Sequence, residues 1–284
     1  MKRLLFVVLA LIAGSALAQS YPSKTIRIIV PFTPGSATDI MGRIVGERLN
    51  AAWGQPVIVD NKPGAGGSIG IREGARSEPD GYTLILVSSG HAVNHVLYKD
   101  LGYDTLKDLS AVAMLGSLPS VLIVPPTSTA NSVKELVAML KASPGKYNYA
   151  TAGVGSGAHV SLEKFNVAAG VKAVHVPLKG TPPILSETMA GRVEYAMVPA
   201  VSGMGPVRDG KVKALAVSTH KRVGALPNVP TLGEAGFPDG ESTFWLALLA
   251  PAKTPADIVA KVNGEVNRAL NTAEVKERLA KLGT

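Results

Sequence analysis

The chain has 284 residues, of which 46% are hydrophobic, and a formal net charge of +8 at pH 7. It contains no cysteine, which excludes disulfides and thiolate chemistry. Its 30 glycines and 20 prolines stay below the share of about 25–30% that is typical of disordered chains. The basic residues are scattered, without a basic block or interleaved aromatic residues, so we expect no nucleic-acid partner.

The first residues have the pattern of an export signal. A positive start at Lys2 and Arg3 precedes an apolar run to Ala13, and a small-x-small cleavage site ends at Ala18. We therefore predict a signal peptide over residues 1–18 and a mature protein in the periplasm. The apolar run is too short to span a bilayer, and no Cys follows the cleavage site to carry a lipid anchor.

Short apolar runs alternate with helical patterns through the rest of the chain. Strands that alternate with helices are typical of an α/β fold with a mostly parallel sheet. The predicted strands are Thr25–Pro31, Val57–Asn61, Thr83–Ser88, Ser120–Val124, Tyr147–Ala150, Ala173–Val176, Val193–Val198, Ala214–Ser218 and Phe244–Ala250.

The predicted helices have clear start and stop signals. One covers Thr38–Ala52, and a capping box from Ser132 to Glu135 opens another. Two prolines in a first turn and Gly191 after the last turn bracket a third helix. A fourth covers Ala256–Leu270, where apolar residues recur every four positions.

Nine strands with helices between them fit two compact domains better than one. We predict a first domain over residues 21–115, a second over 116–225, and a return of the chain to the first domain over 226–284. A hinge would join the two domains.

The segment "RIIVPFTPGSATDIMGRIVGERL" runs from a strand through a tight turn into a helix. The first N–H groups of a helix lack partners within the helix, and the helix dipole adds partial positive charge there. Gly35 allows close approach and Ser36 or Thr38 would cap the helix, so this turn can hold a carboxylate or phosphate. The simpler interpretation is a capped helix with water at its end.

Two more glycine-rich turns stand between a strand and a helix. They are "NKPGAGGSIGIREGA", with Gly64, Gly66 and Gly67, and "TAGVGSGAHVSLEKF", with Gly155 and Ser156. In open parallel sheets, ligands bind in the crevice beyond the carboxyl ends of the strands. The turns of two domains would therefore face each other across one cleft. None of them matches a nucleotide-binding signature.

A secreted hydrolase is the alternative class. Gly66-Gly-Ser68-Ile-Gly70 matches the G-x-S-x-G nucleophile motif. The candidates for the other triad members are Asp104, Asp209, His159, His175 and His220. Four residues separate the strand from the motif, however, and no oxyanion segment precedes it, so a helix-capping role of Ser68 is favoured.

A metal site at His91 and His95 is a further alternative. Their i, i+4 spacing would place both on one helix face. The Glu of a H-E-x-x-H motif is missing and no third ligand stands nearby in the sequence, so we expect no metal.

Motifs along the whole chain resemble those of the Bug receptors, the extracytoplasmic solute-binding proteins of tripartite tricarboxylate transporters. They include "IVPFTPGSATDIMGRIVGERL", "PVIVDNKPGAGGSIG", "NYATAGVGSGAH", "HVPLKGTPPILSETMAGRVEY" and "LPNVPTLGEAGFP". The resemblance implies a periplasmic-binding-protein-like fold of the Venus-flytrap type, in which two α/β domains close on a small carboxylate. Family ligands include tricarboxylates, dicarboxylates, acidic amino acids and aromatic carboxylates.

The resemblance also implies which residues contact the ligand. In the family, the first turn and the glycine-rich second loop hold a carboxylate through backbone N–H groups and ordered water. This carries onto Phe32, Thr33, Pro34, Gly35, Ser36, Ala37 and Asp39, and onto Gly64, Ala65, Gly66 and Gly67. Further contacts are expected from Ser88 and Ser89 at a strand end, and from Thr151, Gly155, Ser156, His159 and Lys179 in the second domain.

Three departures from the family pattern bear on the ligand. Ser36 replaces the second Gly of the usual P-G-G turn, and Leu178 stands where an aromatic residue usually precedes Lys-Gly. The Asp that often follows "RVEY" is absent from "AMVPAVSG". We therefore expect a plain or apolar-bodied carboxylate rather than an amino acid.

The resemblance implies a membrane permease of a tripartite transporter as the partner, and no cofactor, metal or catalytic residue. We expect a monomer. The family usually continues past "KERLAKLGT", so we expect the first domain to be truncated at its C-terminal side. A sensory receptor that presents its ligand to a membrane kinase is an alternative that the sequence does not separate from transport.

Overall fold

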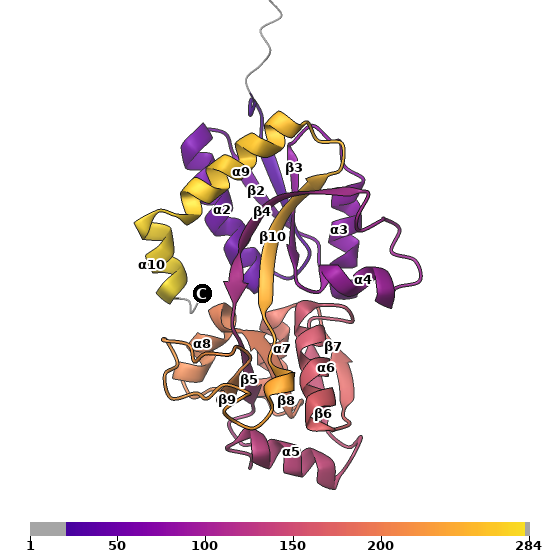
Figure 1. Cartoon of the computed structure of the whole chain (residues 1–284), viewed down its shortest axis with the longest axis vertical. Coiled ribbons are helices and arrows are strands. Elements are labelled where there is room, and N and C mark those ends of the chain that lie inside the picture. The colour runs from indigo at the N-terminus through magenta and orange to yellow at the C-terminus, as the bar shows by residue number, and fades with distance from the viewer. Residues whose placement is uncertain (1–20, 282–284) are drawn as a thin grey trace, which may run out of the picture.

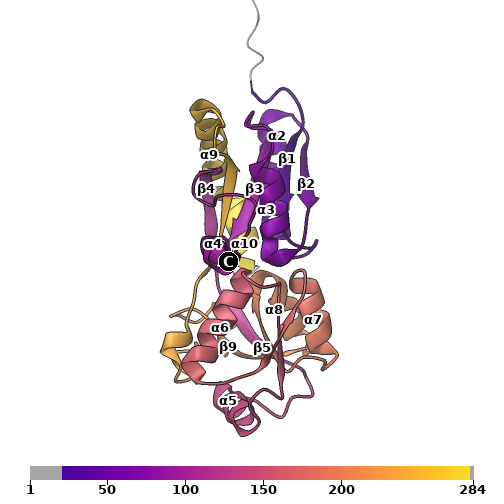
Figure 2. The same ribbon diagram turned by 90° about the vertical axis from the view of Figure 1, so that its right-hand side faces the viewer.

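The computed structural model describes residues 21–281, so the predicted signal peptide lies outside the described residues. Two α/β domains are stacked along the long axis of the molecule, and the chain passes between them twice (Figure 1). Seen from the side, each sheet stands between helices (Figure 2). Among the described residues, no helix has the length and apolar character needed to cross a membrane.

Each domain is built on one five-stranded sheet. The first sheet has the order β2-β1-β3-β10-β4 and the second the order β7-β6-β8-β5-β9. In each sheet four strands run in one direction, and the fifth, β10 or β5, is antiparallel to both neighbours. The strands are β1 Ile26–Val30, β2 Val57–Asn61, β3 Thr83–Ser88, β4 Leu109–Leu118, β5 Ser120–Val124, β6 Asn148–Thr151, β7 Val174–Pro177, β8 Tyr195–Pro199, β9 Lys213–Val217 and β10 Phe244–Pro251.

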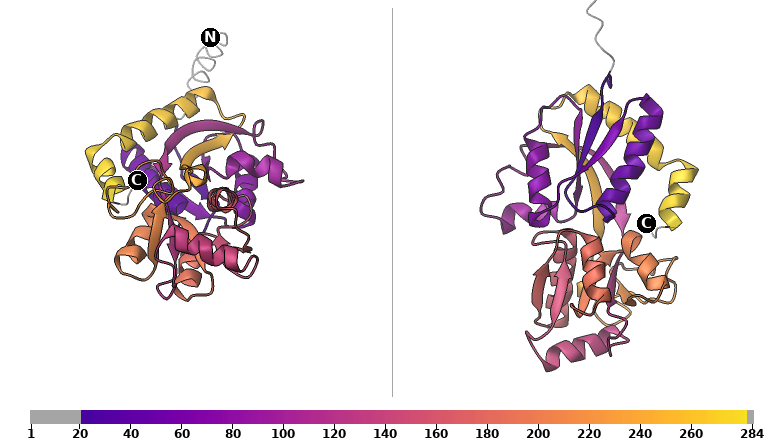
Figure 3. Two further views of the ribbon diagram at one scale, coloured as in Figure 1. Left: turned by 60° about the horizontal axis from the view of Figure 1, so that its bottom comes forward. Right: turned by 180° about the vertical axis from the view of Figure 1, so that it is seen from behind.

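Helices cover both faces of each sheet. The C-terminal helices α9 and α10 lie along the outside of the first domain (Figure 3). The helices are α2 Ala37–Trp53, α3 Ser68–Ala75, α4 His91–Leu97, α5 Val133–Ala142, α6 Gly157–Ala169, α7 Thr181–Met189, α8 Ala200–Arg208, α9 Ala256–Leu270 and α10 Ala273–Lys281. Two short 3₁₀ helices cover Ala65–Gly67 and Pro238–Gly240.

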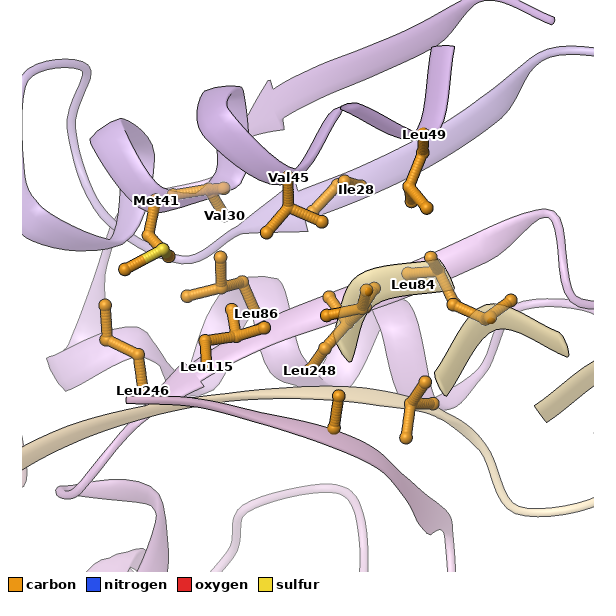
Figure 4. Packing of buried hydrophobic residues seen from close by; sticks show 14 of the residues in the cluster. Ile28, Val30, Met41, Val45, Leu49, Leu84, Leu86, Leu115, Leu246 and Leu248 are labelled. Atoms are coloured by element: carbon orange, nitrogen blue, oxygen red, sulfur yellow. The ribbon is translucent and has the colours of Figure 1, made fainter. Parts of the chain in front are cut away.

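The largest core lies between α2, α9 and the first sheet. Met41, Val45 and Leu49 recur on one face of α2 and point at the side chains of β1 and β3 (Figure 4). The other face of this sheet packs on α3 through Ile71 and Ile85. In the second domain, α5 and α6 cover one face of the sheet, and α7 and α8 cover the other.

The structure confirms the nine predicted strands, with identical bounds for β2, β3 and β5. Strand β4 was not predicted; it pairs with β10 through two register irregularities that interrupt the alternation of inward and outward residues. Helix α8 was not predicted either, because its nine residues include two glycines and Pro206, so that its local helix propensity is low.

The hinge consists of two neighbouring crossings, at 118–120 and at 242–244. Ser218 joins them, because its Oγ accepts from Ser120 N (3.1 Å) and donates to the Ser242 carbonyl (2.9 Å). The second crossing comes later than the expected boundary after residue 225. The intervening segment belongs to the second domain because Leu232 and Phe237 pack in its core, where the Phe237 and Phe165 rings lie 6.0 Å apart.

Candidate functional site

A narrow cavity lies between the two domains, and about 20 Å³ of it is open to the centre of a water molecule. Its lining comes from the carboxyl ends of strands and the first turns of helices on both sides. The lining residues are Phe32, Ser36, Ala37, Thr38, Ser88, Ala152, Ser156, Gly157, Ala158, Gly180, Thr181, Pro199 and Phe244.

Four helix N-termini reach this cavity. Helix α2 comes from the first domain, and α6, α7 and α8 come from the second; residues at the start of each belong to the lining. Each terminus presents N–H groups without intrahelical partners and a partial positive charge of about half a unit. The cavity is therefore suited to an anion, although the described residues that line it include no Lys, Arg or His.

The first-domain turn is held by the side chain of Asp39. Its carboxylate accepts from Gly35 N (2.9 Å), Arg43 Nε (3.0 Å) and Asn61 Nδ2 (3.0 Å), and Asn61 also donates to the Phe32 carbonyl (2.9 Å). Burial favours a higher pKa for Asp39, but these hydrogen bonds outweigh it, so the pKa lies below its ordinary value. The ionised carboxylate thus fixes the turn that carries the start of α2.

Ser36 caps helix α2. Its backbone is extended, and its Oγ accepts from Asp39 N at 3.4 Å. The Ser36 and Thr38 hydroxyls are also hydrogen-bonded to each other at 2.8 Å. Both side chains are buried and belong to the cavity lining, so they place two hydroxyls beside the free N–H groups of the first turn.

The turn before α6 repeats these contacts in the second domain. Ser156 is extended and its Oγ accepts from His159 N (3.2 Å), while Gly155 N donates to His159 Nδ1 (3.3 Å). The His159 and His175 rings are 4.7 Å apart. Burial lowers the pKa of His159, although the nearby Glu163 opposes this, and burial together with His159 lowers the pKa of His175. His159 therefore acts as a neutral acceptor.

Helices α7 and α8 start without side-chain caps. Gly180 precedes α7, and prolines at the second and third positions leave few N–H groups to satisfy in its first turn. Pro199 precedes α8, and Ala200 N donates to the Pro119 carbonyl (2.9 Å) at the hinge. The remaining walls are apolar, chiefly the rings of Phe32 and Phe244.

Comparison with known proteins assigns the family. A sequence model described as "Tripartite tricarboxylate transporter family receptor" matches residues 41–284. BugT of Bordetella pertussis is 38% identical over 283 residues, which cover 98% of this chain and 86% of BugT. The chain belongs to the tripartite tricarboxylate transporter receptor family. It is thus a solute-binding receptor and not an enzyme.

Solved structures share the receptor's fold. The periplasmic binding protein BugD is 32% identical, with a TM-score of 0.89 over 93% of this chain and 88% of BugD. MatC from Rhodopseudomonas palustris, solved with bound malate, is 34% identical, with a TM-score of 0.89 over 93% and 90% of the two chains. A second R. palustris protein, solved with adipate, is 32% identical, with the same TM-score over 93% and 88%. The expected two-domain α/β fold of the periplasmic-binding-protein type is confirmed.

Some of the receptor's predicted site residues line the cavity: Phe32, Ser36, Ala37, Ser88 and Ser156. Others shape the turns around it. The Gly35 N–H is taken by Asp39 and the Gly155 N–H by His159, so neither points into the cavity. Thr151 Oγ1 is hydrogen-bonded to His175 Nε2 at 2.6 Å.

The other predicted residues do not belong to the cavity lining. Thr33 N donates to the Lys179 carbonyl (3.3 Å) across the seam between the domains, and the Lys179 side chain is exposed. Pro34 is exposed beside this contact, and Ser89 lies next to Gly157. The loop Gly64, Ala65, Gly66 and Gly67 packs between the Phe32 ring and the second-domain loop at Gly153 and Val154.

Several lining residues were not predicted as contacts. Thr38, Gly157, Ala158 and Thr181 are the first or second residues after cap positions, so the expected helix starts were a signal for them. Ala152 and Gly180 stand beside predicted residues. Pro199 and Phe244 had no local signal, since they reach the cavity only through the unpredicted α8 and the return of the chain at the hinge.

The alternative sites are placed elsewhere by the structure. Ser68 is the first residue of α3, and its Oγ donates to the Ala65 carbonyl at 2.9 Å. The expectation that Ser68 caps this helix is wrong, because Gly67 is the N-cap and no side chain caps the helix; the Ser68 hydroxyl instead closes the preceding turn. His91 and His95 lie on α4, and within residues 21–281 no group of three or more His, Asp or Glu is arranged to hold a metal.

Proposed function

We propose that the receptor captures a small organic carboxylate in the interdomain cavity and delivers it to the membrane permease of a tripartite transporter. The observation that carries this proposal is the convergence of four helix N-termini from two domains on one cavity. MatC and its R. palustris relative, which were solved with malate and adipate, support the same ligand class. The predicted signal peptide supports a periplasmic location.

The cavity favours a carboxylate with an apolar body. Phe32, Phe244 and several alanines provide apolar walls, which suit a carbon body better than an inorganic anion. The described lining includes no Asp or Glu, which an ammonium group would need as a partner. An amino acid is accordingly a poorer ligand than a plain mono- or dicarboxylate.

Hydrogen bonds from the helix termini are sufficient for a useful affinity. A dissociation constant of about 1 μM requires about 8 kcal/mol. A hydrogen bond to a charged group contributes about 1.5–3 kcal/mol, so about three to five N–H and hydroxyl donors cover most of this. The hydroxyls of Ser36, Thr38 and Ser156 also belong to the lining; because Ser36 and Thr38 are hydrogen-bonded to each other, one proton of that pair remains for a ligand.

A ligand panel tests the proposal. Thermal shift and calorimetry with the mature receptor should show binding of one or more of malate, adipate, tricarboxylates and aromatic monocarboxylates. Sulfate and zwitterionic amino acids serve as comparators and should bind more weakly. Binding of an amino acid in preference to every plain carboxylate would contradict the ligand class, and binding of none of the acids would contradict the proposal as a whole.

A further inference from the structure

Helix α4 of the first domain lies on the second-domain loop that precedes α6. Gly90, Asn94 and Tyr98 are spaced four residues apart along and beside α4, which places them on one face of the helix. This face contacts residues 154–157 of the second domain. The loop ends in Ser156 and Gly157, which line the ligand cavity. We call Gly90, Asn94 and Tyr98 the α4 clasp.

Two members of the α4 clasp form polar contacts across the seam. Tyr98 OH donates to the Val154 carbonyl at 2.7 Å. Asn94 is 1% exposed, and with its NH₂ group facing the adjacent carbonyls it donates to Gly155 O (3.1 Å) and Gly90 O (3.2 Å). A buried amide that satisfies carbonyls of both domains gains its partner only when the domains are in contact.

The third member, Gly90, allows the two backbones to approach. Its φ of −62° and ψ of −26° are open to any residue, so the first domain alone does not require glycine there. A Cβ at this position would overlap the Gly155 carbonyl oxygen and lie 2.6 Å from the Ser156 carbonyl carbon and 2.7 Å from Gly157 N. These three nearest atoms all belong to the second domain.

We propose that the α4 clasp holds the closed arrangement and sets ligand affinity without touching the ligand. None of its three residues belongs to the cavity lining. By fixing residues 154–157, the clasp positions the N-terminus of α6 against the cavity. The effect on affinity rests on the proposed carboxylate function, whereas the effect on closure does not. A ligand binds in proportion to the population of the closed form it requires.

Affinity measurements on matched alanine variants test the clasp. Gly90→Ala should weaken binding of malate or adipate by a factor of about 100 or more, because the added methyl group excludes the closed form. Gly264→Ala is the control, since Gly264 is in helix α9 and a Cβ there meets nothing within 4 Å. Tyr98→Phe should weaken binding about 3- to 10-fold through loss of one hydrogen bond. Gly90→Ala should still unfold in one cooperative transition without ligand, which shows that the variant folds.

A distance measurement tests closure even if neither acid binds. The chain has no cysteine, so spin labels at Leu106→Cys and Val167→Cys, which are 85% and 79% exposed, report the separation of the domains. We expect a short-distance population in the otherwise unchanged receptor and in Gly264→Ala, and its loss in Gly90→Ala. An equal short-distance population in Gly90→Ala, or none in any variant under any condition, would overturn the clasp. Clasp-dependent closure without carboxylate binding would contradict only the proposed ligand.

Discussion

The turns before α2 and α6 share one pattern of hydrogen bonds but differ in the residue that completes it. In each, a glycine with positive φ precedes an extended serine cap, and the glycine N–H donates to the side chain four residues later. That side chain is Asp39 in the first domain and His159 in the second. Asp39 is further held by Arg43 and Asn61, whereas His159 lies against His175. Similar turn geometry is thus completed once by a charged carboxylate and once by a titratable imidazole.

The largest expected effect comes from adding a negative charge at the helix cap of either turn. Ser36→Asp and Ser156→Asp preserve the helix caps, because Asp caps as well as Ser does. Each adds a negative charge beside the bound carboxylate. At about 5 Å and an effective dielectric constant near 20, the repulsion is about 3 kcal/mol, or about 100-fold in affinity. Calorimetry with malate or adipate measures this loss.

The neutral variants Ser36→Asn and Ser156→Asn are the matched controls. Asn has nearly the size of Asp and also caps helices, so these variants should retain most of the affinity. If both Asp variants bound the acid as tightly as their Asn counterparts, the anion would lie away from these termini. A loss at only one of the two turns would assign the carboxylate to that domain.

The second prediction separates the two turns. Asp39→Ala removes the acceptor of Gly35 N, Arg43 and Asn61, so the start of α2 should lose its fixed position. We expect unfolding to become easier by about 2 kcal/mol and carboxylate affinity to fall about 10-fold. Urea unfolding and calorimetry measure the two effects.

Asp39→Asn is the control for shape, because an amide oxygen still accepts from the turn while the pairing with the half-exposed Arg43 is weakened. The stability and the carboxylate affinity of Asp39→Asn should lie between those of the unchanged receptor and those of Asp39→Ala. An Asp39→Ala variant that loses stability but keeps full affinity would show that the α2 terminus contributes little to binding.

These turns also mark the limit of what the sequence predicts. The strand, glycine and cap of "IVPFTPGSATD" predict a helix N-terminus at the cavity, and Ser36 does cap α2 there. The Gly35 N–H donates to Asp39 and so does not face a ligand. Asp39 is held in this position by Asn61, which lies on a neighbouring strand and is distant in sequence. Likewise, the sequence of α8 does not predict a helix, because the contacts that stabilise it come from the second-domain core.

The smallest expected effect is a pH dependence that comes from His159 in the turn before α6 and not from Asp39 in the turn before α2. Burial lowers the pKa of His159 below 6.5, its ordinary value, so the folded receptor disfavours the imidazolium form. The unfolded chain then takes up the proton first as the pH falls below 6.5, and stability declines with it. Protonation of the folded receptor, which needs a still lower pH because the His159 pKa is lowered, also removes the acceptor of Gly155 N, so affinity should decline there. His159→Asn retains a short acceptor without a titrating group and should flatten both declines between pH 7 and about pH 5, as measured by thermal unfolding and calorimetry. An unchanged pH profile in this variant would show that His159 is not the titrating group and would assign the titration to His175 or His91, whose pKa values burial also lowers.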